Sequence, residues 1–324
     1  MGCPGSKTWP QKVASAGPDG PNLGQQPLVQ VRINIKEKSV KIAKQIGAIF
    51  SASVLVLVLS SCATKSTGAI SSDCTKDGLA TLTAGKLTIA TGNPAYYPWV
   101  IDDKPESGDG FEPAVAYAVA EKLGFAKSDV TWVRTTFDGA ITPGAKNFDF
   151  NLQQFSITDE RKKAVDFSSS YYTAPQAVVS YEGSPIAGKT GIEELEGAKL
   201  GAAVGTTSLD AINSVIKPTT QAQVFNDNAA AVTALKNKQI DGIVVDLPTA
   251  FYLSAVEIPK GLIVGQLPSS GKGDEFGLLL AKDSPITNCV SQAVDAIKED
   301  GTLATITEKW LGTDAGAPGL IPRS

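Results

Sequence analysis

The sequence predicts an α/β protein with two lobes, each a mostly parallel sheet flanked by helices, joined by two extended hinge strands. Short β-branched runs alternate with helical segments from residue 86 onward, which is the pattern of parallel sheets covered by helices. The same alternation starts again after residue 180 without an intervening linker rich in proline, glycine or serine. A chain of 324 residues is long enough for two such domains.

The first half of this region contains one expected helix and several expected strands. Ala114–Leu123 has apolar residues at helical spacing and is followed by Gly124, a common helix C-cap. The expected strands are Leu87–Ala90, Val130–Val133 and Phe148–Leu152.

The second half repeats this order of strands and helices. Thr206, Thr207 and Ser208 offer N-cap residues to a helix at Leu209–Ile216. The other expected elements are strands at Lys199–Val204, Gln223–Phe225, Ile243–Asp246, Leu262–Gln266 and Phe276–Leu280, and helices at Ala229–Lys238 and Ile286–Lys298.

Two extended segments, about Gln176–Tyr181 and Glu275–Lys282, stand where the pattern restarts. We interpret them as paired crossings between the lobes, with the last helices returning to the first lobe. Two such crossings make a hinge that bends without a floppy tether. The expected first lobe is 86–178 with 279–312, the second lobe is 179–278, and 313–324 form a C-terminal tail.

The composition excludes several classes of function. The net charge of −4 and the lack of a basic run after the N-terminal segment argue against nucleic acid as a partner. The chain has no histidine, which rules out a Ser-His-Asp or Cys-His enzyme and a histidine-ligated zinc site. We expect no metal and no cofactor.

Residues 1–61 read as an N-terminal extension followed by a lipoprotein signal peptide. Lysines between Lys36 and Lys44 precede the apolar run Ile46–Leu59, which is too short to span a bilayer. The alternative is a buried core helix, although nothing amphipathic flanks the run. The segment that ends in Cys62 resembles the lipobox of bacterial lipoproteins, so we expect Cys62 to carry lipid and 62–85 to act as a tether.

Export changes the interpretation of the two remaining cysteines. Cys3 lies in the segment that would be removed, which leaves Cys74 and Cys289. In an oxidising compartment these two could form a disulfide, and the alternative is a pair of unrelated buried thiols.

Side chains that could hold a ligand follow the predicted strands. Ligands of open α/β sheets bind outside the carboxyl ends of strands. Arg161 can pair with a carboxylate in a bidentate way, and Asp246 can accept hydrogen bonds from an ammonium group. Tyr96 and Phe137 would sandwich the rest of the ligand. Further candidates are Asn93, Trp99, Gln153, Gln154, Ser156, Thr206 and Thr207.

Each of these residues also has an ordinary structural interpretation. Arg161 lies in a charged run that could be a solvated helix face, and Asp246 could simply cap a helix. Tyr96 and Phe137 could belong to the core. The binding interpretation is favoured because these residue types recur together at several strand ends.

The chain also resembles a known family, the polar amino-acid family of ABC-transporter solute-binding proteins. The resemblance covers nearly all of 86–312, and the block Ser156–Ser168 is its most specific part. Other matching segments are Thr88–Thr91, Tyr96–Trp99, Gly110–Glu112, Phe137–Gly139, Tyr171–Tyr172, Val204–Ser208, Asp241–Asp246, Asp300–Leu303 and Lys309–Gly312.

This resemblance implies a fold of the periplasmic-binding-protein type II, which closes on one free L-amino acid and delivers it to an ABC permease with its ATPase. It implies that Arg161 binds the ligand carboxylate, that Asp246 binds the ammonium, and that Tyr96 and Phe137 sandwich the ligand. Ser156 falls on the hydroxyl position and Thr206 and Thr207 on the second-lobe loop. It also matches Cys74 and Cys289 to a disulfide that some relatives carry.

The chain departs from the family pattern in the pocket. Asn93 stands where an aspartate is usual, and Gln153 and Gln154 stand where small residues are usual. Only Arg134 and Arg161 occur in the predicted lobes, so an acidic ligand would lack a second arginine. We therefore expect a neutral, glutamine-like or asparagine-like ligand.

Two other functions remain open at this stage, an amino-acid-sensing accessory binder and an exported enzyme on the same fold. An enzyme would need an acid–base residue in the pocket, for which Glu112 and Asp138 are the nearby candidates. We expect no catalytic residue, a monomer, and a location on the outer face of the bacterial cytoplasmic membrane, held there by lipid.

Overall fold

A computed structural model describes residues 71–268, 273–312 and 317–323, all within one compact unit, Cys62–Ser324. The predicted signal segment, Cys62 and most of the tether lie outside the described residues. In the described ranges, no helix is long and apolar enough to cross a membrane.

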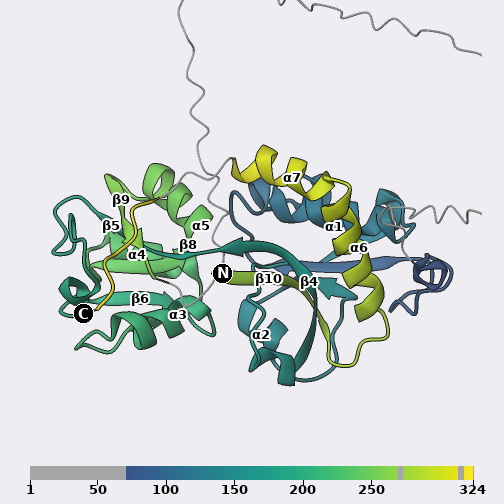
Figure 1. Ribbon diagram of the computed structural model, residues 1–324, viewed down its shortest axis with the longest axis horizontal. Coiled ribbons are helices and arrows are strands. Elements are labelled where there is room, and N and C mark those ends of the chain that lie inside the picture. Colours follow the sequence, from purple (N-terminus) through teal and green to yellow (C-terminus); the bar gives the residue numbers. More distant parts are fainter. Residues whose placement is uncertain (1–70, 269–272, 313–316, 324) are drawn as a thin grey trace, which may run out of the picture. The chain divides into compact units, whose positions relative to one another are not determined.

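The first lobe is built on a five-stranded sheet in the order β2-β1-β3-β10-β4 (Figure 1). Strand β10 runs antiparallel to both of its neighbours, and the other four strands run in one direction. The strands are β1 Leu87–Gly92, β2 Val130–Thr135, β3 Phe150–Asn151, β4 Val165–Ala174 and β10 Asp274–Ala281.

The second lobe repeats this plan with the order β7-β6-β8-β5-β9, in which β5 is the antiparallel strand. Its strands are β5 Gln176–Tyr181, β6 Leu200–Ala203, β7 Gln223–Phe225, β8 Gly242–Asp246 and β9 Gly261–Gln266. The prediction of two lobes with mostly parallel sheets is therefore confirmed.

The chain passes between the sheets at two places that lie side by side. Pro175 alone separates β4 from β5, and a longer segment connects β9 to β10. Asp274 pairs with Ala174 in the first sheet, while the backbone N–H of Leu267 donates to the carbonyl of Gln176 at 2.8 Å. The segments expected as crossings are thus built into the sheets as β5 and β10, and the passages lie directly before them. Strands β5 and β10, which the chain enters after each passage, are the antiparallel strands of their sheets.

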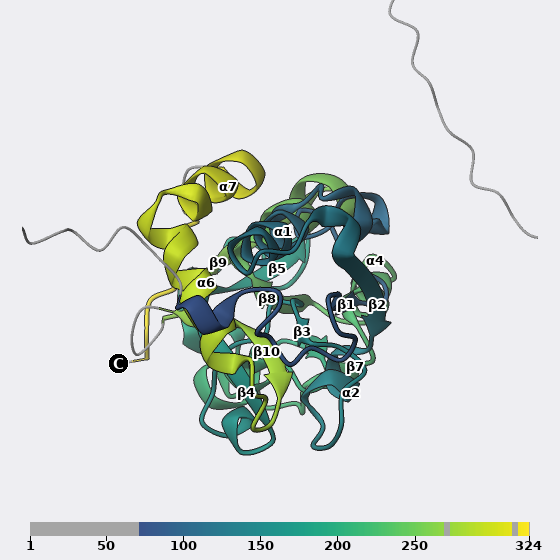
Figure 2. The same cartoon turned by 90° about the vertical axis from the view of Figure 1, so that its right-hand side faces the viewer.

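Helices cover both sheets. In the first lobe α1, α6 and α7 pack together on one side of the sheet, and α2 lies on the opposite side (Figure 2). Their bounds are α1 Phe111–Lys122, α2 Phe137–Ile141, α6 Thr287–Glu299 and α7 Thr302–Leu311. Apolar side chains from the sheet fill both interfaces, as shown by buried clusters around Phe150 on one face and Phe155 on the other.

The second lobe has three α-helices in its described part, and two of them continue into a π-helical turn. Their bounds are α3 Thr207–Ala211, continued by Ile212–Ile216; α4 Asn228–Lys236; and α5 Leu247–Tyr252, continued by Leu253–Glu257. The predicted helix Leu209–Ile216 therefore starts two residues earlier than expected, because Thr206 is its N-cap. Short 3-10 turns occupy Ser72–Cys74, Ile101–Asp103, Pro105–Ser107, Lys127–Asp129, Arg161–Lys163 and Ile192–Leu195.

A disulfide joins Cys74 to Cys289 of α6 and confirms that prediction over the alternative of two free thiols. It fixes the segment that precedes β1 to the first lobe. The backbone N–H of Ser71 donates to Gln292, also on α6, at 2.9 Å, and Lys76 pairs with Asp129 at 2.6 Å.

The C-terminal residues pack on the second lobe although α7 belongs to the first. Gly319 bridges to Gln266 of β9, and Ile321 bridges to Gly191. Leu320 is 4 % exposed and completes an apolar cluster with Ile192 and Val264. The chain therefore reaches the second lobe again after its last helix.

Replacing Cys74 and Cys289 together by serine should lower the unfolding free energy by up to about 5 kcal/mol, because the crosslink closes a loop of 215 residues in the unfolded chain. Urea unfolding of the oxidised protein and of the double variant measures the difference. Wild type treated with dithiothreitol is the control and should match the variant. Equal midpoints for all three samples would contradict the stabilising role.

Candidate functional site

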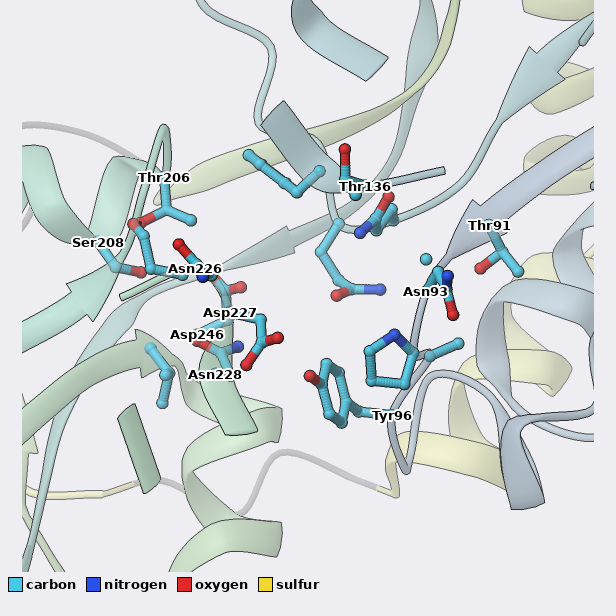
Figure 3. A pocket seen from close by; sticks show the side chains of 18 of the residues that line it. Thr91, Asn93, Tyr96, Thr136, Thr206, Ser208, Asn226, Asp227, Asn228 and Asp246 are labelled. Carbon is cyan, nitrogen blue, oxygen red and sulfur yellow. The ribbon is translucent and has the colours of Figure 1, made fainter. Parts of the chain in front are cut away.

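A polar cavity of about 180 Å³ lies between the lobes, lined by loops from both sheets (Figure 3). Each wall is made of residues at the carboxyl end of a strand, as the rule for α/β sheets predicts. The first lobe contributes the turns after β1 and β3 and the start of α2, and the second lobe contributes the turns after β6, β7 and β8. The predicted site residues among the lining are Asn93, Tyr96, Phe137, Gln153, Gln154, Ser156, Thr206, Thr207 and Asp246.

Local capping brings several of these side chains to the cavity. The hydroxyl of Thr206 accepts the backbone N–H of Leu209 at 3.2 Å and starts α3, while Thr136 caps α2 in the same way through Gly139. These caps turn the chain sharply at the ends of β6 and β2. Thr207 and Phe137, the first residues of the two helices, are therefore held at the cavity.

Arg161 lies beside the cavity but not in its lining. Its guanidinium donates to the carbonyl of Ser156 at 2.7 Å and to the carbonyl of Gly205 in the other lobe at 2.9 Å. It also lies over the ring of Phe137, 5.3 Å from the centroid, and that ring stacks on Phe155. Burial lowers the pKa of Arg161, but arginine stays charged at neutral pH. A buried cation thus stands at the contact between the lobes.

Asp246 supplies a carboxylate to the opposite wall. The carboxamide of Gln176 donates to it at 2.7 Å and to Asp274 at 2.9 Å. Burial, followed by the nearby charge of Asp274, raises the pKa of Asp246 to about 7. The carboxyl group is therefore costly to ionise unless a positive group approaches it.

The carboxylate of Asp274 accepts hydrogen bonds from hydroxyl groups of both lobes. Thr207 donates to Asp274 at 2.5 Å, and Ser156 donates to the same oxygen at 3.3 Å. The two hydroxyls also lie 3.1 Å apart, although they belong to different lobes. Ser156 and Thr207, both among the predicted site residues, thus lie together at the cavity.

Trp99 does not line the cavity. It is 1 % exposed in the first-lobe core, where its ring packs edge-on against Phe111 and Phe276. Its indole N–H donates to Thr249 of the second lobe at 2.8 Å. Next to it, the rings of Tyr97 and Tyr252 meet across the lobes with centroids 4.8 Å apart. Trp99 and Tyr97 of the first lobe therefore each contact a residue of the second lobe.

Several lining residues are not among the predicted site residues. Asn226, Asp227 and Asn228 follow β7, and Thr91, Thr136 and Ser208 stand beside predicted residues. One carboxylate oxygen of Asp227 caps α4 by accepting the backbone N–H of Ala230 at 2.8 Å. The strand-end rule would have found Asp227 had it been applied to Gln223–Phe225 as well.

The possible acid–base residues, Glu112 and Asp138, do not line the cavity. Glu112 is 1 % exposed within the first lobe. In the part of the chain that the structure describes, no three His, Cys, Asp or Glu side chains lie close enough to share a metal ion.

The polar cavity between two matching lobes has counterparts in known proteins. Residues 87–313 match the model of the bacterial extracellular solute-binding proteins, family 3. The probable histidine-binding protein of Campylobacter jejuni subsp. jejuni is 30% identical over 227 residues, which is 69% of this chain and 85% of that protein.

Solved structures of amino-acid-binding proteins are similar to this chain in sequence and in fold. An ancestral arginine-binding protein bound to arginine is 30% identical with a TM-score of 0.59, covering 69% of this chain and 97% of that one. The same kind of protein bound to glutamine is 30% identical with a TM-score of 0.61, covering 71% and 100%. Related proteins are substrate-binding components of amino-acid transport. The chain therefore belongs to the bacterial extracellular solute-binding proteins, family 3.

Proposed function

We propose that this protein is the substrate-binding component of an ABC importer that captures a free polar amino acid and delivers it to a membrane permease. The observation that carries the proposal is the pair Arg161 and Asp246. Arg161 is a buried cation of the first lobe beside the cavity, and Asp246 is a carboxylate of the second lobe in the wall of that cavity, which hydroxyl and amide groups also line. An α-carboxylate and an α-ammonium are the complement of that pair.

Capture would proceed by closure about the two adjacent passages. Each lobe carries only part of the binding groups, so the full set of contacts forms only when the lobes approach. The ligand then shifts the population toward the closed form. The hydrogen bond from Arg161 to the carbonyl of Gly205 and the Trp99–Thr249 contact are of the kind that would stabilise this form.

We infer that the side chain of the ligand forms hydrogen bonds. Carboxamides line much of the cavity, among them Asn93, Gln153 and Gln154, which supports the glutamine-like or asparagine-like ligand that the sequence favours. A cationic amino acid is the second candidate, because the carboxylate of Asp227 also lines the cavity and relatives are described as binding histidine or arginine.

The remaining expectations belong to the same proposal. Lipid on Cys62 would hold a monomer on the outer face of the cytoplasmic membrane, near its permease. An accessory sensor would use the same capture step without a permease. An enzyme is the weakest alternative, because neither Glu112 nor Asp138 reaches the cavity.

A calorimetric screen of the twenty amino acids against the mature chain is the direct test. We expect tight binding of glutamine or asparagine, and no binding of glutamate or aspartate, because the cavity presents carboxylates and no second arginine. Binding of only acidic amino acids, or of none, would refute the proposal. Delivery is tested separately by uptake in cells with and without the gene.

Asp246→Asn should abolish binding and stabilise the empty protein above neutral pH. The pKa of Asp246 rises from 3.8 to about 7 on folding, so the unfolding free energy falls as pH rises through that window. Asparagine avoids this cost, and the melting temperature at pH 8 should increase by several degrees, with little change near pH 4. The fully exposed Asp159→Asn is the control and should leave both quantities unchanged. A variant that melts lower at pH 8 would contradict the assignment.

Asp227→Asn separates the two ligand classes. Asparagine keeps the N-cap of α4 and removes only the charge. The affinity for glutamine should change by less than about threefold, whereas any affinity for arginine or lysine should fall at least about tenfold. Titration calorimetry of the three ligands measures both. An equal loss for neutral and cationic ligands would show that Asp227 acts on the fold rather than on ligand charge.

A further inference from the structure

A buried carboxylate lies beneath the cavity wall. Glu112, the second residue of α1, is 1 % exposed and accepts three hydrogen bonds. The hydroxyl of Tyr171 and the backbone N–H of Gln154 donate to its Oε1 at 2.5 and 2.7 Å. The side-chain Nε2 of Gln154 donates to its Oε2 at 2.6 Å. Glu112 is therefore paired entirely with donors, as an ionised carboxylate requires.

Gln154 connects this carboxylate to the ligand cavity. Its side chain lines the cavity, and its backbone has a φ of 51°, a left-handed conformation that is unfavourable for a residue with a long side chain. Both its backbone N–H and its side-chain Nε2 are bonded to Glu112. The carboxylate thus holds the strained turn and the side chain at once.

The chemistry of the pair determines which end of the carboxamide meets the ligand. A carboxylate only accepts hydrogen bonds, so it selects Nε2 and turns Oε1 away from itself. Among the described residues, none donates to that Oε1. Tyr171 cannot reverse this arrangement, because burial and the charge of Glu112 raise the pKa of Tyr171 well above 10 and its hydroxyl remains a donor.

We propose that Glu112 is a positioning residue that sets the hydrogen-bond polarity of the cavity, by holding Gln154 with its carbonyl oxygen toward the ligand. The inference rests on the proposed function and extends it, because it assigns the ligand a side chain that donates at this point. The side-chain oxygen of Gln153 is buried without a partner among the described residues, and Asp227 adds a carboxylate, so neighbouring groups also accept.

The variant Glu112→Gln reverses this polarity with almost no change in shape. The side-chain carbonyl of the introduced glutamine would take the place of Oε1 of Glu112, which accepts hydrogen bonds from two donors. The side-chain N–H₂ group of the introduced glutamine would then face Gln154. Two facing amide N–H₂ groups repel, so Gln154 turns and presents Nε2 to the cavity. Tyr171→Phe is the matched control, since it removes a donor from Glu112 but keeps the carboxylate. Gln154→Leu removes the carboxamide and identifies its resonance.

The orientation of Gln154 is read by NMR of glutamine-selective ¹⁵N-labelled protein at pH 8. There Glu112, whose pKa burial raises to about 7, is ionised. In wild type and Tyr171→Phe, one Gln154 side-chain N–H should be shifted downfield and exchange slowly with solvent. In Glu112→Gln this signature should disappear. A folded Glu112→Gln protein with the wild-type resonance overturns the inference.

Recognition is read with a pair of ligands of nearly equal shape, L-glutamine and L-2-amino-5-oxohexanoate, in which a methyl ketone replaces the amide, so that only glutamine donates from its side chain. Wild type and Tyr171→Phe should prefer glutamine by about tenfold or more, and Glu112→Gln should lose or invert this preference. An unchanged preference in Glu112→Gln overturns the inference. If wild type binds no amino acid while the NMR signature holds, the proposed function fails and the orientation of Gln154 stands.

Discussion

The carboxamide of Gln176 connects the two passages between the lobes to the ligand site. It follows the first passage and donates to Asp274, which follows the second. It also donates to Asp246 and accepts a hydrogen bond from Ser208 at 2.6 Å. One side chain therefore links both passages to a carboxylate and a helix start in the cavity wall. In the proposed closure, a rotation at the passages would change the geometry of this hydrogen-bond network, and a bound ligand would in turn act on the passages.

Burying the carboxyl groups of this site costs free energy, because burial disfavours their ionised forms. Asp246 and Glu112 are carboxyl groups whose pKa values burial raises to about 7. Glu112 is compensated within the first lobe by three donors, whereas Asp246 has Gln176 on one side and the charge of Asp274 on the other. The first arrangement is complete without a ligand, and the second would be completed by the ammonium group of the proposed ligand. Such a contrast is expected when one group supports a site and the other binds within it.

The sequence predicted the fold well because strand and helix periodicity is local. Strands β5 and β7 have their expected bounds. Strand β4 was missed, since its run of serines and its burial at every third residue do not resemble a half-buried strand. Lining residues were found where the strand-end rule was applied, and Asp227 was missed where it was not. The placements of Trp99 and Arg161 depend on side-chain direction within a loop, which residue order alone does not specify. The sequence indicated Glu112 as a possible acid–base residue. Its hydrogen-bond donors could not be predicted, because Gln154 and Tyr171 are distant from it in the sequence.

The return of Ala317–Arg323 to the second lobe has a consequence for how this chain folds. Leu320 belongs to the second-lobe core, while the first-lobe sheet includes β10 between β3 and β4. Both lobes therefore include segments that are distant in sequence from the rest of the lobe, β10 in the first and Leu320 in the second. Contacts between residues so far apart in sequence make folding slow and couple the two lobes to one another. Gly312 and Ala317 also remain within about 18 Å in any state of the lobes, because five extended residues span no more. The chain between Gly312 and Ala317 therefore limits how far the two lobes can separate while Leu320 stays in the second-lobe core.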